Sequence, residues 1–215
     1  MTIGRLASRL ALGAAVTALV TAGLGAPAAQ AHGKSKPLGT KSLAAVLTAD
    51  TSGFDRNGRD FDVLTAAVLA VLDAKPNSAV KVLTDGNVAL TTFAPTDGAF
   101  RQLARELTHK RLAPTELSAF KTVAGLGIDT VEAVLLYHVV PGATIDKKAA
   151  FRADGARLTT AAGSKIKVDV RWHRVTLVDA DRNDRNPTVV VFNTNKGNKQ
   201  IAHAVNRVLR PVDLP

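Results

Sequence analysis

The sequence has 215 residues, of which 46% are hydrophobic and only 4% aromatic, and it contains no cysteine. This length predicts one domain with a core built mainly from aliphatic side chains. The missing thiols exclude disulfide bonds, cysteine nucleophiles and cysteine-ligated metals. The formal net charge of +10 favours anionic partners such as wall polymers, acidic polysaccharides, lipid head groups or nucleic acid.

Residues 1–31 have the pattern of a secretory signal peptide. Two arginines precede an apolar, uncharged run from Leu10 to Leu24, and Ala29-Gln30-Ala31 fits the small-x-small pattern before a cleavage site. The alternative is a membrane anchor, but the apolar run is shorter than the ~20 residues that span a bilayer. We therefore expect a secreted, extracellular protein that begins at His32 and is not stably inserted in a membrane. Association with the cell wall is one expected location.

Cleavage before His32 leaves a chain with 26 Lys and Arg against 18 Asp and Glu, a net charge of +8. We divide this mature chain into a basic linker over residues 32–37, a domain over residues 38–211 and a C-terminal tail over residues 212–215. The sequence shows no internal repeat of useful length, so we expect one copy of one domain.

The first half of the predicted domain is dominated by helical patterns. Residues 42–49 and 62–74 are expected to form helices, and the second segment has apolar residues at helical spacing on one face. The loop between them, residues 50–62, contains several acids that resemble a calcium-binding loop. Arg56 and Arg59 lie where such a loop needs oxygen ligands, so we interpret this segment as an acidic, solvated loop without metal.

A strand over residues 88–93 leads into the next helix. The segment Ala94-Pro95-Thr96-Asp97 is typical of a helix entry, since Thr96 or Asp97 can cap the free N–H groups of the first turn. Further helices are predicted to begin near Pro114 and at Asp129, where Glu132 three residues on indicates a capping box.

Residues 133–142, AVLLYHVVPG, join this helical half to a half with strand patterns. The segment starts as an apolar helix face, becomes extended and stops at Pro141-Gly142, a pair that breaks helix and strand alike. Tyr137, the only tyrosine, and His138 lie in its middle. Two interpretations stay open for this pair: a partly exposed contact with a stacking ring and a titratable proton donor, or a structural pair whose histidine bonds a backbone group.

After Gly142 the hydrophobic period changes from 3.6 to 2 residues. Apolar and polar residues alternate over residues 165–170, 175–177 and 200–209, and an apolar run covers residues 189–191. Short links join these four predicted strands, which favours antiparallel pairing. Helices followed by strands predict an α+β domain.

Two segments together resemble the fasciclin domain family: TTFAPTDGAF at residues 91–100 and LLYHVVPG at residues 135–142. The end of the chain, QIAHAVNRVLRP at residues 200–211, resembles the closing strand of that family. The resemblance covers roughly residues 38–211 and is that of a single-domain, secreted member of bacterial type. The positions that match the structural motifs of the family are Phe93, Pro95, Thr96, Asp97, Phe100, Pro141, Gly142 and His203.

This resemblance implies a fasciclin-like fold, in which a wedge of mostly antiparallel β-strands packs beside several α-helices. It also implies an extracellular adhesion or matrix-contact module and not an enzyme. In animal matrix members of the family, the Tyr-His pair that matches Tyr137 and His138 has been tied to integrin binding.

The most basic stretch of the chain, residues 147–174, indicates where an anionic partner would bind. It holds eight Lys and Arg against two Asp, a local net charge of +6. Strand alternation places several of these cations on one exposed face, and Trp172, the only tryptophan, lies among them, which suits sugar stacking or polyanion contact. The alternative is an ordinary solvated strand face with Trp172 packed at its edge. The candidate binding residues are Tyr137, His138, Lys165, Lys167, Arg171, Trp172 and Arg174.

The remaining patterns argue against a catalytic or cofactor-dependent protein. None of the five histidines has zinc-ligand spacing, and the sequence has no nucleophile elbow and no glycine-rich phosphate loop. The acids of DADRND, residues 179–184, are interpreted as a polar turn, because Arg182 and Arg185 would repel a cation. We expect no catalytic residue, cofactor or metal, and no nucleic-acid partner because aromatics are too few for stacked single strands.

Three functions remain open at this point. The first is a non-enzymatic adhesion module that binds extracellular or cell-surface polymers or proteins, with anionic polysaccharide as one candidate. The second is a protein–protein interaction module that uses the Tyr137-His138 region and binds no polyanion. The third is a small-molecule binder or hydrolase, which would need a concave pocket that gathers His138 or His203 with carboxylates.

Overall fold

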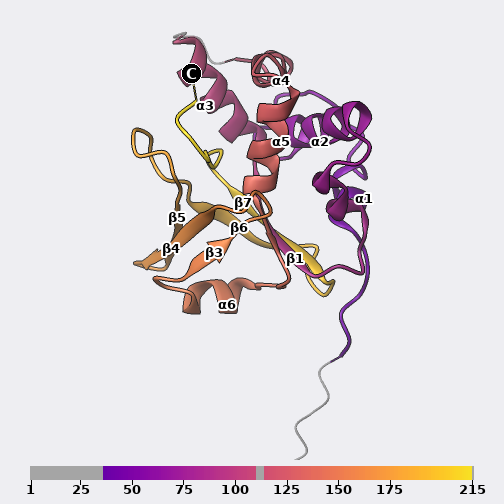
Figure 1. The fold of residues 1–215 in the computed structure, drawn as a ribbon, viewed down its shortest axis with the longest axis vertical. Coiled ribbons are helices and arrows are strands. Elements are labelled where there is room, and N and C mark those ends of the chain that lie inside the picture. Colours follow the sequence, from indigo (N-terminus) through magenta and orange to yellow (C-terminus); the bar gives the residue numbers. More distant parts are fainter. Residues whose placement is uncertain (1–35, 110–113, 215) are drawn as a thin grey trace, which may run out of the picture. The chain divides into compact units, whose positions relative to one another are not determined.

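Two strands that are far apart in the sequence pair at the centre of the domain (Figure 1). Strand β1 (Leu90–Pro95) lies parallel to strand β7 (Gln200–Val205), and every residue of both strands is buried. Strand β2 (Val139–Pro141) pairs antiparallel with β1, and strand β6 (Val189–Thr194) pairs antiparallel with β7. The resulting four-stranded sheet has the order β2-β1-β7-β6.

The computed structural model describes residues 36–109 and 114–214. A second, antiparallel sheet has the order β3-β4-β5 and is formed by β3 (Arg157–Thr159), β4 (Lys165–Arg171) and β5 (Arg174–Val178). The helices of the described part are α1 (Leu43–Leu47), α2 (Asp62–Ala74), the 3₁₀ helix η1 (Ala79–Thr84), α3 (Asp97–Thr108), α4 (Glu116–Ala124), α5 (Ile128–Tyr137) and α6 (Lys147–Arg152). Across these two ranges, no helix has the length and apolar character needed to cross a membrane. The predicted signal peptide and most of the predicted linker lie outside the described residues.

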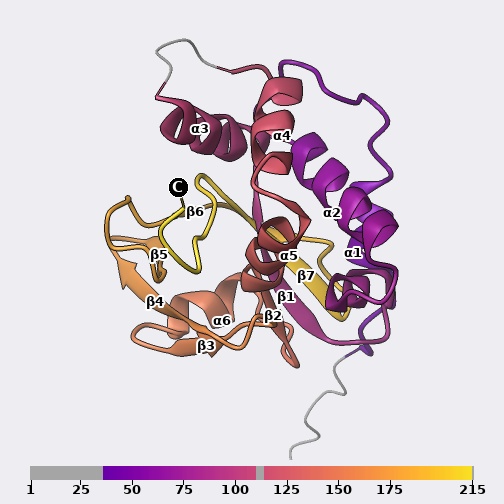
Figure 2. The same cartoon turned by 45° about the horizontal axis from the view of Figure 1, so that its top comes forward.

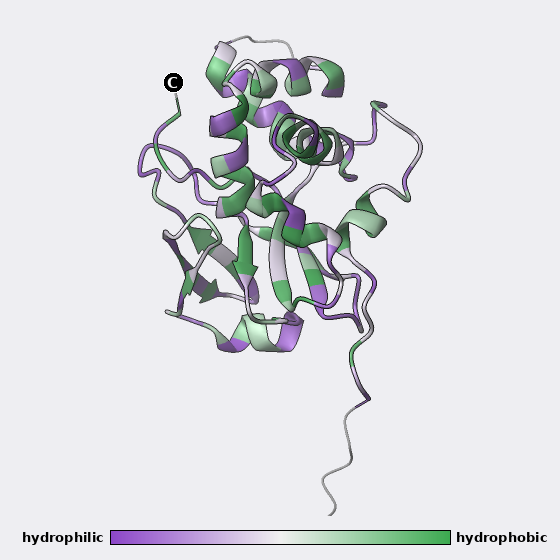
Figure 3. Ribbon diagram, turned by 45° about the vertical axis from the view of Figure 1, so that its right-hand side comes forward, coloured by the Kyte–Doolittle hydropathy of each residue, from purple (hydrophilic) through white to green (hydrophobic). Residues whose placement is uncertain are grey.

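Two hydrophobic clusters lie on either side of the four-stranded sheet. Alternation along β1 sends Leu90 and Ala94 into the first cluster and Phe93 into the second. The first cluster packs among helices α1 to α5, and the second packs between the two sheets, where Ile166 and Leu177 are fully buried. Figures 1 and 2 show this layering, and Figure 3 shows apolar residues concentrated in the central strands and the inner helices.

The predicted helix entry at Thr96-Asp97 serves two helices and not one. The Thr96 hydroxyl accepts a hydrogen bond from the Ala99 N–H (3.3 Å) and thereby caps α3. The Asp97 carboxylate instead accepts from the backbone N–H groups of Asp62 (2.9 Å) and Val63 (2.8 Å), the first residues of α2. Since the residue at the N-cap of α2 makes no side-chain cap, Asp97 supplies that cap from a distant part of the chain.

The α+β class and the helix over residues 62–74 are confirmed. Three local expectations were wrong. The residues of β7 do not alternate between core and solvent, because this strand is covered on both faces and pairs parallel with β1. Helix α6 interrupts the region where only strands were predicted. The predicted capping box is absent from α5, whose N-cap is Gly127, and Glu132 bonds Lys75 and Ser78 instead.

Replacement of Leu90 by Ala tests the central place of β1. Leu90 is fully buried where β1 packs against the helices. We therefore expect the substitution to lower the free energy of unfolding in urea by about 2–5 kcal/mol. The control is Leu69→Ala on the exposed side of α2, for which we expect a change within about 0.5 kcal/mol. A loss at position 90 no larger than that of the control would contradict this packing.

Candidate functional site

The outer face of the three-stranded sheet carries a continuous row of cations. Burial alternates along β4, so that Ile166 and Val168 point into the second hydrophobic cluster while their neighbours point outwards. The register places Arg157 of β3 opposite Lys167, and Arg171 opposite Arg174 of β5. We call the exposed cations of these strands the basic face: Arg157, Lys165, Lys167, Arg171 and Arg174.

Among the residues of strands β3, β4 and β5, Asp169 is the one acid on this face. Asp169 accepts a hydrogen bond from Arg171 Nε (3.1 Å), and that arginine is largely exposed. Within residues 36–109 and 114–214, the other four members of the basic face make no ion pair. Like charges directly opposite one another destabilise an antiparallel sheet, so the pairs Arg157–Lys167 and Arg171–Arg174 do not serve the fold. A bound anion would relieve this repulsion.

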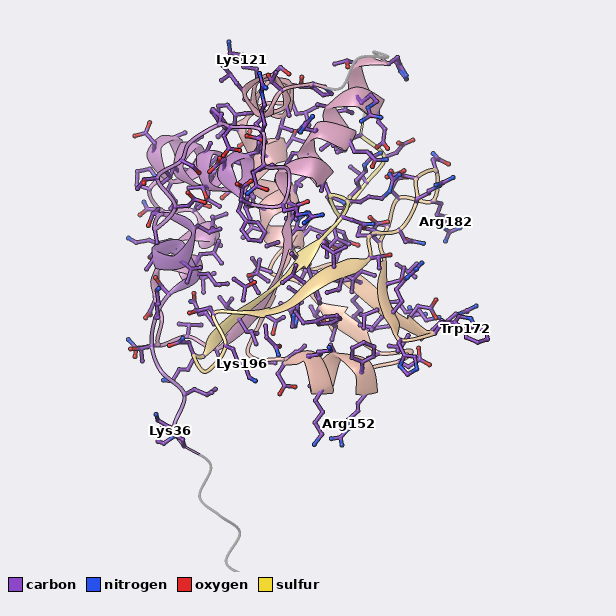
Figure 4. The ribbon with its side chains drawn as sticks, turned by 180° about the vertical axis from the view of Figure 1, so that it is seen from behind. Lys36, Lys121, Arg152, Trp172, Arg182 and Lys196 are labelled. Carbon is purple, nitrogen blue, oxygen red and sulfur yellow. The ribbon has the colours of Figure 1, made fainter. Side chains whose placement is uncertain are left out.

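A hollow of about 430 Å³ opens at one end of the basic face. Arg157, Lys165 and Lys167 line it from the sheet, and the loop of residues 179–186 lines it from the other side. Figure 4 shows Arg182 of this loop extending away from the domain. Four cations line the hollow, three from the sheet and Arg182 from the loop, together with three acids of the loop, Asp179, Asp181 and Asp184.

Arginines from the C-terminal segment pair with two of the three acids of this loop. Arg207 bonds Asp184 (2.9 Å), and Arg210 bonds Asp181 (3.3 Å), with Glu106 of α3 joined to both arginines. Burial raises the pKa of Asp179 to about 6, and the Arg210 N–H donates to that carboxylate. In this polar turn Asp181 and Asp184 face guanidinium groups, and Asp179 faces a backbone N–H.

The tip of the β4–β5 hairpin presents the only tryptophan to solvent. Trp172 and His173 form the two-residue turn between Arg171 and Arg174, and the Trp172 residue is 97% exposed. Figure 4 shows Trp172 at the outer margin of the domain. Both turn residues have positive φ, 49° and 60°, a conformation that favours Asn-Gly in such a turn and costs a residue with a side chain roughly 1–2 kcal/mol. A large apolar ring held out in this way points to a contact role.

The structure places Tyr137 and His138 inside the domain. The two residues are 0% and 2% exposed, respectively. The His138 Nδ1–H donates to the Val134 carbonyl (2.7 Å), and Nε2 accepts from the Leu209 N–H (2.9 Å). The Tyr137 hydroxyl donates to the Lys165 carbonyl (3.2 Å). This geometry matches the structural interpretation of the pair, and we do not carry these two residues into the contact surface.

The other predicted motif residues also support the fold. His203 is buried, with Nδ1 accepting from the Asn193 N–H (3.2 Å) and Nε2–H donating to the Ile145 carbonyl (2.7 Å). Gly142 has φ +83° after Pro141 and ends β2 at a turn that favours glycine. Because both nitrogens of both buried imidazoles are engaged, neither is available as a general base, and the hydrolase interpretation loses its candidate residues. The remaining motif positions Phe93, Pro95 and Phe100 are buried.

Sequence reasoning located the charged strand but missed the hollow beside it. Lys165, Lys167, Arg171 and Arg174 do lie on one exposed face with Trp172 at its end. Arg157 and Arg182 were not among the candidates. Arg157 lies beside β4 because of the register of the sheet, and Arg182 lies near it because of the position of its loop. The sequence signal for Arg157 was its place in the basic stretch of residues 147–174, and Arg182, outside that stretch, had no such signal.

Comparison with known proteins identifies the family. The fasciclin domain family profile matches residues 64–211. The chain belongs to the fasciclin domain family. Among solved structures, this fasciclin domain is similar to a FAS1 domain pair from the insect cell adhesion molecule Fasciclin I, with 13% sequence identity and a TM-score of 0.55. The alignment covers 80% of this chain and 51% of that one, so the chain spans about half the length of the domain pair. No curated protein sequence gives a significant match.

The buried histidine of the fasciclin domain predicts a defined pH dependence of stability. Burial lowers the pKa of His138 to about 4, below the value near 6.5 of an unfolded histidine. Between these values the unfolded chain binds a proton that the folded chain does not, so the free energy of unfolding falls as pH drops from 6.5 towards 4. We expect His138→Gln to remove roughly 3 kcal/mol of this fall, measured by urea unfolding across the window.

The matched control for this measurement is His109→Gln, which changes an exposed histidine. The control is expected to keep the wild-type slope, even if its absolute stability differs. An unchanged slope in His138→Gln would contradict the buried, neutral state of this imidazole.

The hairpin tip predicts a substitution that stabilises the domain. Changing Trp172→Asn together with His173→Gly gives the turn the residues that its backbone favours, and the exposed indole loses no packing. We expect the free energy of unfolding to rise by about 1–2 kcal/mol, measured in urea and followed by circular dichroism. A loss of stability would show that Trp172 makes stabilising contacts and would contradict an exposed ring.

Proposed function

We propose that this fasciclin domain is a secreted, non-enzymatic adhesion module that binds anionic polymers of a cell surface or matrix. Its contact surface is the basic face of β3–β5 with the Trp172 tip. The observation that carries the proposal is the row of exposed cations, two pairs of which oppose one another across the sheet. The similar insect structure is described as part of a cell adhesion molecule, which supports the same class of function.

Charge and geometry suit a polymer better than a small ligand. The cations extend along β4 from the hollow at Lys165 to the hairpin tip at Arg174, so a linear polyanion can contact several of them in succession. Each exposed contact contributes little alone, but several together give salt-sensitive binding. Trp172 at the end of the row offers an aromatic face on which a sugar ring can stack.

The proposed extracellular location of the protein rests on its first residues. The pattern of residues 1–31, with two arginines before an apolar run and Ala-Gln-Ala at its end, supports secretion. The adhesion proposal needs this export, because wall and matrix polymers lie outside the cell.

The alternatives have less support. A protein–protein module built on Tyr137 and His138 would need these side chains at the surface, and both are buried. A hydrolase would need a free histidine beside carboxylates, and the nitrogens of His138 and His203 are both bonded to the backbone.

The test is retention on an immobilised anionic polysaccharide, with heparin as the probe, at about 50 and 500 mM salt, which screen exposed charges to different degrees. We expect the variant with Lys165, Lys167, Arg171 and Arg174 changed to Gln to bind roughly tenfold or more weakly at low salt, since four exposed ionic contacts are lost. The Trp172→Asn, His173→Gly variant should weaken binding to sugar polymers while it stabilises the fold.

The matched control lowers the net charge by the same four units outside the basic face: Lys41, Lys81, Lys121 and Lys196, all exposed, are changed to Gln. This control should keep most of the wild-type retention. Equal losses in both variants would mean that net charge alone drives binding. Unchanged binding of the basic-face variant would refute the proposed surface.

A further inference from the structure

Five carboxylates gather on the helical side of the domain, away from the basic face. Asp55 and Asp60 come from the loop before α2, Asp62 from the first turn of α2, Asp97 from the start of α3 and Glu116 from the start of α4. Asp60, Asp97 and Glu116 each offer an oxygen within 4.8 Å of the others, and Asp55, Asp60 and Asp62 do the same. Asp60 belongs to both groups, so the five form one cluster.

Buried oxygens in this cluster lack hydrogen-bond partners. The Glu116 residue is 1% exposed, and while its Oε2 accepts from the Asp55 N–H (2.6 Å), its Oε1 has no partner. Asp62 is 8% exposed, and its Oδ2 has no partner either. The Asp60 Oδ1 is a third such atom. A buried acceptor without a partner is costly, above all when it is charged, and three in one cluster require a common explanation.

No protein cation in the described part of the chain balances these acids. Among residues 36–109 and 114–214, none of the five carboxylates forms an ion pair, and Arg56 and Arg59 of the same loop point into solvent. The described residues therefore supply this cluster with no compensating positive charge.

The arrangement fits a hard divalent cation. Calcium binds oxygen ligands at 2.3–2.6 Å, so oxygens on opposite sides of the ion lie up to roughly 5 Å apart. The 4.8 Å limit of both groups falls within this span. Magnesium gives up its water ligands reluctantly and is seldom held by an all-protein set of carboxylates, so the cluster suits calcium better. One member of the cluster, Asp62, also lines a hollow of about 250 Å³ together with Asp50, Phe54 and Thr65.

We propose that Asp60, Asp62 and Glu116, together with Asp55, bind one Ca²⁺ ion beside the N-terminus of α2. Asp97 holds the site in place, because both of its oxygens already accept N–H groups of α2. The ion would tie the loop of residues 50–61 to α2 and α4. The loop sequence alone predicted no metal, since it lacks enough ligands; the missing ligand comes from Glu116, far along the chain. This site is independent of the proposed adhesion surface.

The test is titration of the purified, EDTA-treated protein with CaCl₂ at pH 7.5, by calorimetry and by thermal unfolding. We expect one ion per chain and, at about ten times the dissociation constant, a rise in melting temperature of roughly 3–5 °C. MgCl₂ at the same concentration should give a smaller rise. Glu116→Gln keeps an acceptor for the Asp55 N–H and should weaken calcium binding at least tenfold.

Asp73→Asn is the matched control, since it removes one exposed carboxylate from the same helix α2 and should bind calcium as the wild type does. Asp62→Asn provides a second site variant if Glu116→Gln does not fold. The absence of heat and of any thermal shift up to 10 mM CaCl₂, roughly ten times the weakest dissociation constants of extracellular calcium modules, would overturn the proposal and assign the cluster to shared protons. Wild-type affinity in a folded site variant would overturn it too.

Discussion

The parallel pair β1–β7 constrains every other part of this domain. A strand that is buried on both faces and both edges can leave none of its N–H and C=O groups unpaired, so β2 and β6 must cover the outer edges. Its two faces must each meet an apolar layer, and the helices supply one layer while the three-stranded sheet supplies the other. The two ends of the pair are closed by further backbone bonds, from the Leu90 N–H to the Lys199 carbonyl and from the Thr96 N–H to the Val205 carbonyl.

The Tyr137-His138 pair links the central strands to the strand that carries the basic face. His138 joins the end of α5 to the segment after β7 through Val134 and Leu209. Tyr137 holds the first residue of β4 through the Lys165 carbonyl, and β4 carries the central cations of the basic face. The family resemblance implied that Tyr137 and His138 contact a partner. In this structure the pair instead positions β4, the strand that we propose makes the contact. Its neutral, buried state requires the low pKa of His138.

The net charge of the chain conceals a separation of charge within the fold. Cations gather on the outer face of β3–β5, and carboxylates gather where the starts of α2, α3 and α4 meet. Like charges held close together are unfavourable until an ion of the opposite sign joins them. The same argument supports both of our proposals, an anionic polymer on one side and a divalent cation on the other.

Local patterns in the sequence determined the parts that depend on local periodicity and capping. The alternation of Lys165, Ile166, Lys167 and Val168 settles which side of β4 meets solvent, and the Thr96 hydroxyl caps the helix that follows it because the cap lies within one turn. These features were sufficient to predict the α+β class and four of the five cations of the basic face. Tertiary structure decided what lies between distant segments. Burial of β7 on both faces, the cap that Asp97 gives to α2, the burial of Tyr137 and the meeting of Glu116 with Asp60 all depend on which elements pack together, and no period within a single segment carries that information.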